Sequence, residues 1–116
     1  TAQDWDSLET SCTSGNTNMM QMFFYESSFN ADIGSWDISS VFEMRRMFIG
    51  ATSFNQDISA WDTSSVSNMT GMFDNATSFN QDLSGWCVSL ISSEPSNFDN
   101  NSQSWVLPKP IWGTCP

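Results

Sequence analysis

Histidine is absent from this chain of 116 residues, and cations are scarce, with three Lys and Arg together against thirteen Asp and Glu. Without histidine the commonest general base of enzymes is missing, and neither a Ser-His-Asp set nor a zinc-type Cys/His motif can be built. Phosphate binding requires clustered Lys and Arg, so a formal charge of −10 argues against nucleic acid as a partner. The composition favours a non-catalytic protein, and a hydrolase built on a pair of carboxylates is the weakest alternative.

Long apolar runs are missing too. No segment approaches the roughly 20 apolar residues of a membrane span, and no basic segment followed by an apolar one opens the chain. We therefore expect no membrane insertion in this segment. The chain begins at Thr1 instead of Met, which we interpret as the mark of a processed protein or an excised domain.

Aromatic residues, by contrast, are abundant and regularly spaced. Trp36, Trp61 and Trp86 are 25 residues apart. Self-similarity at such a period is typical of proteins whose units bury their apolar faces by stacking on their neighbours, so we expect the Trp, Phe and Met columns to form the core. Columns with the same spacing contain Phe29, Phe54 and Phe79; Asn30, Asn55 and Asn80; Asp32, Asp57 and Asp82; Leu8, Ile33, Ile58 and Leu83; and Met22, Met47 and Met72.

Two spacings alternate within each repeat. The alternation of apolar residues around Trp36 predicts a short strand. Met44, Met47 and Phe48 at i, i+3 and i+4 predict a turn or two of helix, which Gly50 ends in a left-handed conformation. The sequence thus predicts an α/β solenoid, a leucine-rich-repeat-like, right-handed stack of about four 25-residue coils, each with one strand and one short helix, closed by N- and C-terminal caps.

Three regions follow from the repeat. We expect a degenerate N-terminal capping repeat at residues 1–28, the central 25-residue repeats at 29–89 and a C-terminal cap at 90–116. In the last region the pattern loosens, and its prolines cannot donate to a strand ladder. We expect this tail to lie over the last coil, with Trp105 and Trp112 packed on it.

The three cysteines, Cys12, Cys87 and Cys115, allow one pair and leave one remainder. Cys87 and Cys115 bracket the region where the repeat decays, a usual place for a disulfide. The alternative is that all three are buried thiols of a reducing compartment.

Carboxylates recur with the repeat, and stacking would bring them ~5 Å apart, close enough to repel and to raise one another's pKa. Hydrogen bonds to backbone amides of the next coil would relieve this repulsion, and so would Ca2+, which binds oxygen ligands. We expect no other cofactor. The possible metal ligands are Asp32, Asp57, Asp82, Asp37 and Asp62. The asparagine column is expected to be structural, with its side chains hydrogen-bonded to backbone amides coil after coil.

Outward residues of the predicted strands would form one continuous surface of small and acidic side chains. We expect this surface to act in interaction or adhesion outside the cell, with a protein or glycan at a cell surface, or a second copy of the chain, as the partner. The alternatives are a calcium-dependent, glycan-binding or, from the rows of hydroxyls, ice-binding adhesin. The predicted interaction face contains Ser35, Asp37, Ser39, Ala60, Asp62, Ser64, Gly85 and Ser89.

The stretch ATSFNQDISAWDTSSVSNMTGMF at residues 51–73 resembles the BspA-like surface-protein repeat of mycoplasma lipoproteins and of marine bacterial and algal surface proteins. The segments LSGWCVS at 83–89 and KPIWGTCP at 109–116 resemble the terminal cap of the marine bacterial members. The resemblance covers about residues 19–116 and implies an extracellular leucine-rich-repeat-type solenoid in adhesion or recognition, with Cys87 paired to Cys115. It offers no catalytic residues. The degenerate first repeat and Cys12 depart from it.

Overall fold

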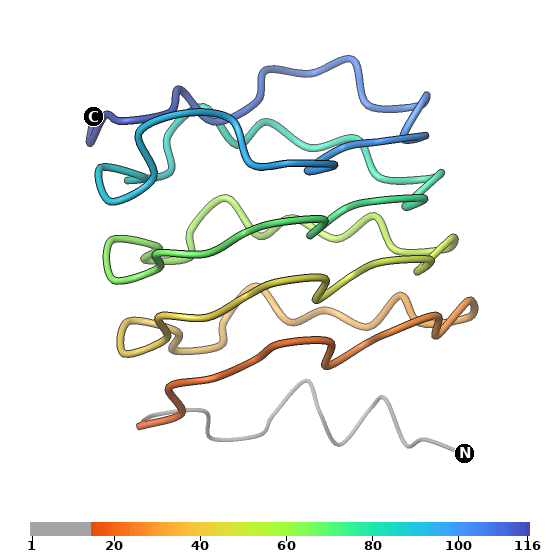
Figure 1. The fold of residues 1–116 in the computed structure, drawn as a ribbon. Helices are drawn as coiled ribbons and strands as arrows, with labels where there is room; N and C mark the ends of the chain where they lie inside the picture. The colour runs from red at the N-terminus through yellow and green to blue at the C-terminus, as the bar shows by residue number, and fades with distance from the viewer. Residues whose placement is uncertain (1–14) are drawn as a thin grey trace.

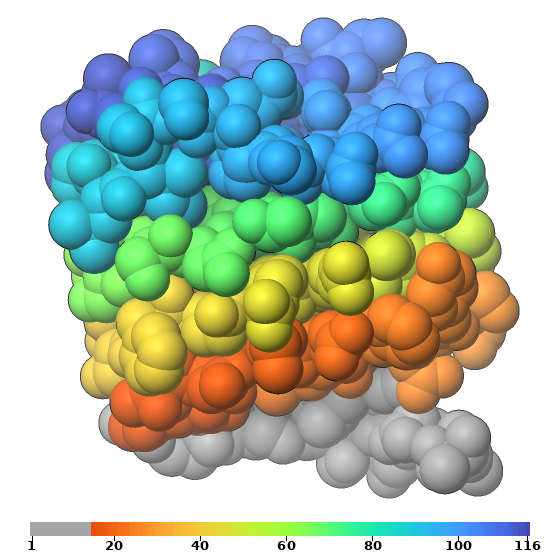
Figure 2. All heavy atoms as spheres, viewed as in Figure 1, coloured from red at the N-terminus to blue at the C-terminus, as the bar shows by residue number. Residues whose placement is uncertain are grey.

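The chain runs back and forth through successive layers in the computed structural model, which describes residues 15–116 (Figure 1). Backbone hydrogen bonds join each layer to the next at a separation of 24 or 25 residues. The Met19 amide donates to the Glu43 carbonyl at 2.9 Å, and the Met44 amide donates to the Asn68 carbonyl at 2.9 Å. Side chains fill the space between the layers (Figure 2). Residues one period apart in the sequence therefore lie in neighbouring layers. The principal-axis extents of this compact body are 37 × 32 × 19 Å.

The predicted α/β solenoid is wrong. Residues 15–116 contain no helix and no strand, and their β pairing is limited to two isolated parallel bridges, Asn18 with Glu43 and Glu43 with Asn68. The right-handed, leucine-rich-repeat-like arrangement of one strand and one helix per coil is therefore absent from the described part of the chain, and so is the regular repeat protein that it implied. The same residues offer no helix long and apolar enough to cross a membrane.

The methionine segments show why no helix forms. The Met47 amide donates to the Met44 carbonyl at 3.2 Å and closes a turn whose third residue, Arg46, has φ 56°. A second turn follows with Gly50 at φ 70°. A right-handed helix needs negative φ throughout, whereas a positive φ at the third position is typical of type II turns. The i, i+3, i+4 spacing therefore comes from tandem turns, and the predicted left-handed conformation of Gly50 is confirmed without the helix.

Turns also replace the predicted strands. The Trp36 amide donates to the Ile33 carbonyl at 3.1 Å, and the Val41 amide donates to the Ile38 carbonyl at 2.9 Å. Each turn brings the next apolar side chain back to the interior. The alternation around Trp36 therefore arises from successive turns, and a pleated backbone is not needed to produce it.

The predicted core is confirmed for the Trp and Phe columns. One column of stacked rings has centroid separations of 5.5 and 5.7 Å, and a second has 5.7 and 5.4 Å. The indole of Trp61 is buried and donates from Nε1 to the Ile33 carbonyl of the preceding layer at 3.0 Å. Met22 differs from Met47 and Met72 of its column, because it is 38% exposed. The stacked columns contain Phe29, Phe54 and Phe79, and Phe23, Phe48 and Phe73.

The C-terminal tail covers the last layer, as predicted. Trp105 is buried, and Trp112 is partly buried against Phe98 with ring centroids 4.8 Å apart. The disulfide between Cys87 and Cys115 is present. These contacts close the apolar interior at this end of the molecule.

The predicted regional boundaries at residues 28 and 89 stay predictions. Two residues of the predicted N-terminal cap, Leu8 and Cys12, lie outside the described residues.

Candidate functional site: an acidic face of Asp-Ser turns

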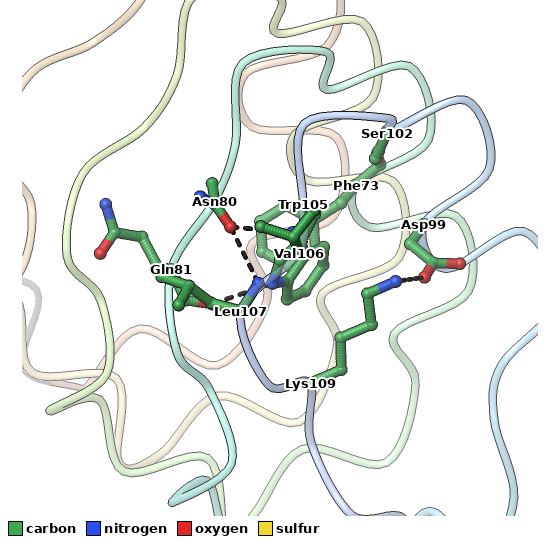
Figure 3. A network of polar contacts seen from close by, with 9 residues as sticks. All are labelled: Phe73, Asn80, Gln81, Asp99, Ser102, Trp105, Val106, Leu107 and Lys109. Atoms are coloured by element: carbon green, nitrogen blue, oxygen red, sulfur yellow. Dashed lines mark hydrogen bonds and ion pairs between the residues drawn. The ribbon is translucent and has the colours of Figure 1, made fainter.

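The asparagine column holds the layers in register in the same segments of the chain as the recurring aspartates. The Asn55 amide donates to Oδ1 of Asn30 at 2.8 Å, and the Asn80 amide donates to Oδ1 of Asn55 at 2.8 Å. At the last layer Oδ1 of Asn80 accepts from the amides of Val106 and Leu107 at 2.9 and 3.0 Å (Figure 3). The predicted structural role of this column is confirmed.

Four aspartates of the face accept two hydrogen bonds each from the serine two residues later. At Asp62, Oδ1 accepts from the Ser64 amide at 3.1 Å and from the Ser64 hydroxyl at 2.6 Å. At Asp32 the residue two positions later is Gly34, whose amide donates to Oδ1 of Asp32 at 3.0 Å. Such Asx turns fix the carboxylate against its own backbone. The other Asp-Ser pairs are Asp37 with Ser39, Asp57 with Ser59 and Asp82 with Ser84.

These hydrogen bonds determine the acidity of the face. The serine hydroxyl, and after it the serine amide, lowers the pKa of Asp37, Asp57, Asp62 and Asp82. For Asp62 the neighbouring charge of Asp37 acts in the opposite direction, but it is the smallest of the causes of the pKa shift. Repulsion between exposed charges is screened by water, whereas the hydrogen bonds act at contact distance.

Two sequence-based predictions about the acidic columns are therefore wrong. The pKa of each of these four carboxylates is lowered, because the hydrogen bonds outweigh the repulsion that Asp37 exerts on Asp62. The amide that donates to each of them lies two residues later in the same layer, because a two-residue turn brings that amide to the carboxylate.

The predicted interaction-face residues lie in segments that share one side of the molecule. Residues 29–41, 54–66 and 79–91 run one above another on the side away from the viewer in Figure 1. Ser64 is half-buried. The column of Asp37 and Asp62 has Cys87 at its next position, and this cysteine is bonded to Cys115. The exposed members are Ser35, Asp37, Ser39, Ala60, Asp62, Gly85 and Ser89.

The described residues do not assemble the possible metal ligands into a metal site. No group of three or more His, Cys, Asp or Glu within residues 15–116 could hold a metal ion. Asp57, Asp62 and Asp82 each direct Oδ1 toward the neighbouring serine. The calcium hypothesis for Asp32, Asp57, Asp82, Asp37 and Asp62 gains no support from this geometry.

Sequence reasoning missed the pairing of aspartate with serine, although the signal was present. The tripeptides Asp-Ile-Ser at 37–39 and 57–59, Asp-Thr-Ser at 62–64 and Asp-Leu-Ser at 82–84 place a hydroxyl two residues after each carboxylate. This spacing favours Asx turns.

One comparison with known proteins gives a match. A family model described as a Mycoplasma protein of unknown function, DUF285, matches residues 2–106. The description agrees with the mycoplasma part of the resemblance and does not extend to the BspA-like part. No curated protein and no solved structure matches the chain.

Proposed function

The chain belongs to the DUF285 family of Mycoplasma proteins of unknown function, and for this member we propose a non-catalytic interaction or adhesion module exposed outside the cell. The disulfide between Cys87 and Cys115 supports this location, because disulfides persist in oxidising surroundings and are rare in the cytosol. The BspA-like character of the repeat, with its adhesive roles, forms part of the same proposal.

The observation that carries the proposal is the exposed face of aligned Asp-Ser turns. Its carboxylates are held by hydrogen bonds of 2.6 Å from serine hydroxyls, so little side-chain freedom remains to be lost on binding. Ala60 lies between Asp57 and Asp62, Gly85 lies between Asp82 and Cys87, and both leave the backbone open to close approach. Such a surface suits a partner that is flat and rich in hydrogen-bond donors or in positive charge.

The experiment compares two tryptophan substitutions. Ala60→Trp places a bulky ring in the middle of the face, and Thr77→Trp places the same ring at another exposed position outside the predicted face. The probes are intact cells and a panel of immobilised oligosaccharides, each incubated with fluorescently labelled protein. We expect Ala60→Trp to reduce binding at least tenfold and Thr77→Trp to leave it unchanged. Equal binding by both variants would show that this face is not the binding surface.

Calcium provides a second arm of the same experiment. Since Asp57, Asp62 and Asp82 direct Oδ1 to serines, we expect neither binding nor the thermal unfolding midpoint to change between millimolar Ca2+ and EDTA. A clear upward shift of the midpoint with Ca2+ would instead identify a calcium-dependent adhesin.

A further inference from the structure

Large apolar side chains lie exposed on the side of the molecule opposite the acidic face. Met20, Phe24, Tyr25 and Phe42 are 37, 46, 55 and 49% exposed. They belong to residues 15–28 and 42–50, which form the two lowest coloured bands facing the viewer (Figures 1 and 2). Together with the exposed Arg45 and Arg46 these four residues are called the aromatic–arginine patch.

Contacts between the two layers join the patch into one surface. The Tyr25 amide donates to the Ile49 carbonyl at 2.8 Å, and the Tyr25 ring lies so close over Gly50 that a Cβ there would overlap with it. The rings of Phe24 and Tyr25 meet edge to face with centroids 4.6 Å apart. Nη2 of Arg45 lies 2.8 Å from the Met20 sulfur.

Within residues 15–116 the arginines of the patch have no acidic partner. Among the described residues the one ion pair joins Lys109 to Asp99 at 2.6 Å, so neither Arg45 nor Arg46 is neutralised by a carboxylate. Glu26 and Glu43 lie in the same two layers and are half-buried. Two arginines and two glutamates give this region a formal charge of zero, whereas the whole chain carries −10.

Backbone strain is concentrated in the same place. Gln21, Tyr25 and Arg46 have φ of 57°, 54° and 56°, a conformation that favours glycine and asparagine. The 25-residue spacing places Gly71 after Arg46 and Gly50 after Tyr25, and both glycines also have positive φ. Two of the strained positions, Tyr25 and Arg46, therefore carry long side chains of the patch where glycine would fit the turn with less strain, and the third, Gln21, lies next to Met20. Strain of this kind is often kept at functional surfaces.

We propose that the aromatic–arginine patch is the interface through which two copies of this chain associate about a two-fold axis. Met, Phe, Tyr and Arg are enriched at protein interfaces, and Tyr and Arg are also enriched at their energetic centres. A two-fold contact is self-complementary, so Arg45 and Arg46 of one copy face Glu26 and Glu43 of the other. Elsewhere two copies of a protein of charge −10 repel, whereas the neutral patch allows them to meet. This surface is separate from the acidic face and does not depend on its function.

The test measures association of the full chain by sedimentation velocity from low to high micromolar concentration. Wild-type protein is expected to form dimers, and Phe42→Ser and Phe24→Ser are each expected to raise the dimer dissociation constant at least tenfold. Leu90→Ser is the matched control, because Leu90 is a similarly exposed apolar residue, 58% exposed, outside the patch. The thermal midpoint of each variant shows that it is folded. A wild-type protein that is monomeric at every concentration overturns the proposal, and so does a dimer that both Phe variants leave intact.

A charge exchange tests the two-fold arrangement itself. The Arg45→Glu/Arg46→Glu variant and the Glu26→Arg/Glu43→Arg variant are each expected to be monomeric, and an equimolar mixture is expected to restore dimers. If the second variant does not fold, Glu26→Arg alone replaces it, because Glu43 also accepts hydrogen bonds from the Arg45 amide and the Asn68 side chain. No recovery in the mixture would overturn the arrangement. If the wild-type protein is monomeric and pellets with vesicles of anionic lipid, the patch binds a membrane, and the proposal that it binds a second copy of the chain is overturned.

Discussion

Asp57 shows how a single carboxylate of the acidic face is fixed by hydrogen bonds within its own turn. Its Oδ1 accepts from the amide of Ser59 at 3.0 Å and from the hydroxyl at 2.6 Å. Both bonds favour the ionised carboxylate and lower the pKa of Asp57. The same arrangement recurs at Asp37, Asp62 and Asp82, so the serine two residues later holds each of these carboxylates in place.

The first prediction concerns the acidity of Asp57. Ser59→Ala removes the hydroxyl, the larger cause of the lowered pKa, and leaves the amide. The pKa of Asp57 is therefore expected to rise toward the usual value, about 3.9, in a carboxyl NMR titration of the variant. An unchanged pKa would show that the hydroxyl bond is not made in solution.

The pH dependence of stability follows from the same four carboxylates. Because the pKa of each is lower in the folded than in the unfolded protein, their contribution is fully present above about pH 4 and is lost as the pH falls through the folded values. The free energy of unfolding in denaturant is expected to fall between pH 5 and the most acidic conditions, with a smaller fall in Ser59→Ala. The contribution of each exposed carboxylate is small.

The second prediction concerns Gly50. With φ of 70° and the Tyr25 ring against its Cα, Gly50→Ala introduces both a left-handed alanine and an overlap. The left-handed conformation alone costs about 1 to 2 kcal/mol of unfolding free energy. In a Tyr25→Ser background only this part remains, so a double-mutant cycle separates the two effects. A neutral Gly50→Ala substitution in wild-type protein would contradict the turn geometry.

Turns are the recurring element, and they explain which sequence signals were reliable. The apolar columns correctly located the core, because buried positions are occupied by apolar residues in turns as well as in helices and strands. The helix at Met44, Met47 and Phe48 was wrong because tandem turns repeat after four residues and imitate the helical spacing of three and four. Gly50 was compatible with a turn from the start, since a glycine with positive φ fits a turn as well as it fits a helix cap.

The third prediction concerns the asparagine column. Asn55→Ala leaves the amide of Asn80 without its acceptor at 2.8 Å and is expected to cost about 1 kcal/mol of unfolding free energy. Asn55→Asp keeps an acceptor oxygen at the same position and is the matched control. Equal losses of stability in the two variants would argue against the hydrogen bond as the cause.

The fourth prediction concerns the disulfide, which closes a loop with a sequence separation of 28 residues. On the chain-entropy account, its removal by Cys87→Ala/Cys115→Ala is expected to lower the unfolding free energy by about 3 to 4 kcal/mol. Reductant should lower the thermal midpoint of the wild-type protein and leave that of the double variant unchanged. A wild-type midpoint insensitive to reductant would contradict the expected contribution.

At the scale of the whole molecule, the layers align residues that are 25 positions apart, so that the Trp and Phe columns fill the interior and the aspartates share one face. The period of 25 residues was sufficient to identify the core columns, the asparagine column and the pairing of Cys87 with Cys115 as candidates. It was not sufficient to distinguish strands and helices from turns, because each arrangement can return a side chain to the interior at the same intervals. The aromatic–arginine patch escaped notice because its residues replace polar, small or buried ones in only two layers and form no column.

Turns, held in register by aromatic and asparagine columns, align the acidic face without helices or strands. The backbone and aromatic NMR spectrum of the full chain tests this arrangement. We expect positive φ at Arg46, Gly50 and Asn75, and nuclear Overhauser contacts from the Phe54 ring to both the Phe29 and Phe79 rings. Continuous helical chemical shifts through residues 44–49, with no contacts between these rings, would contradict it.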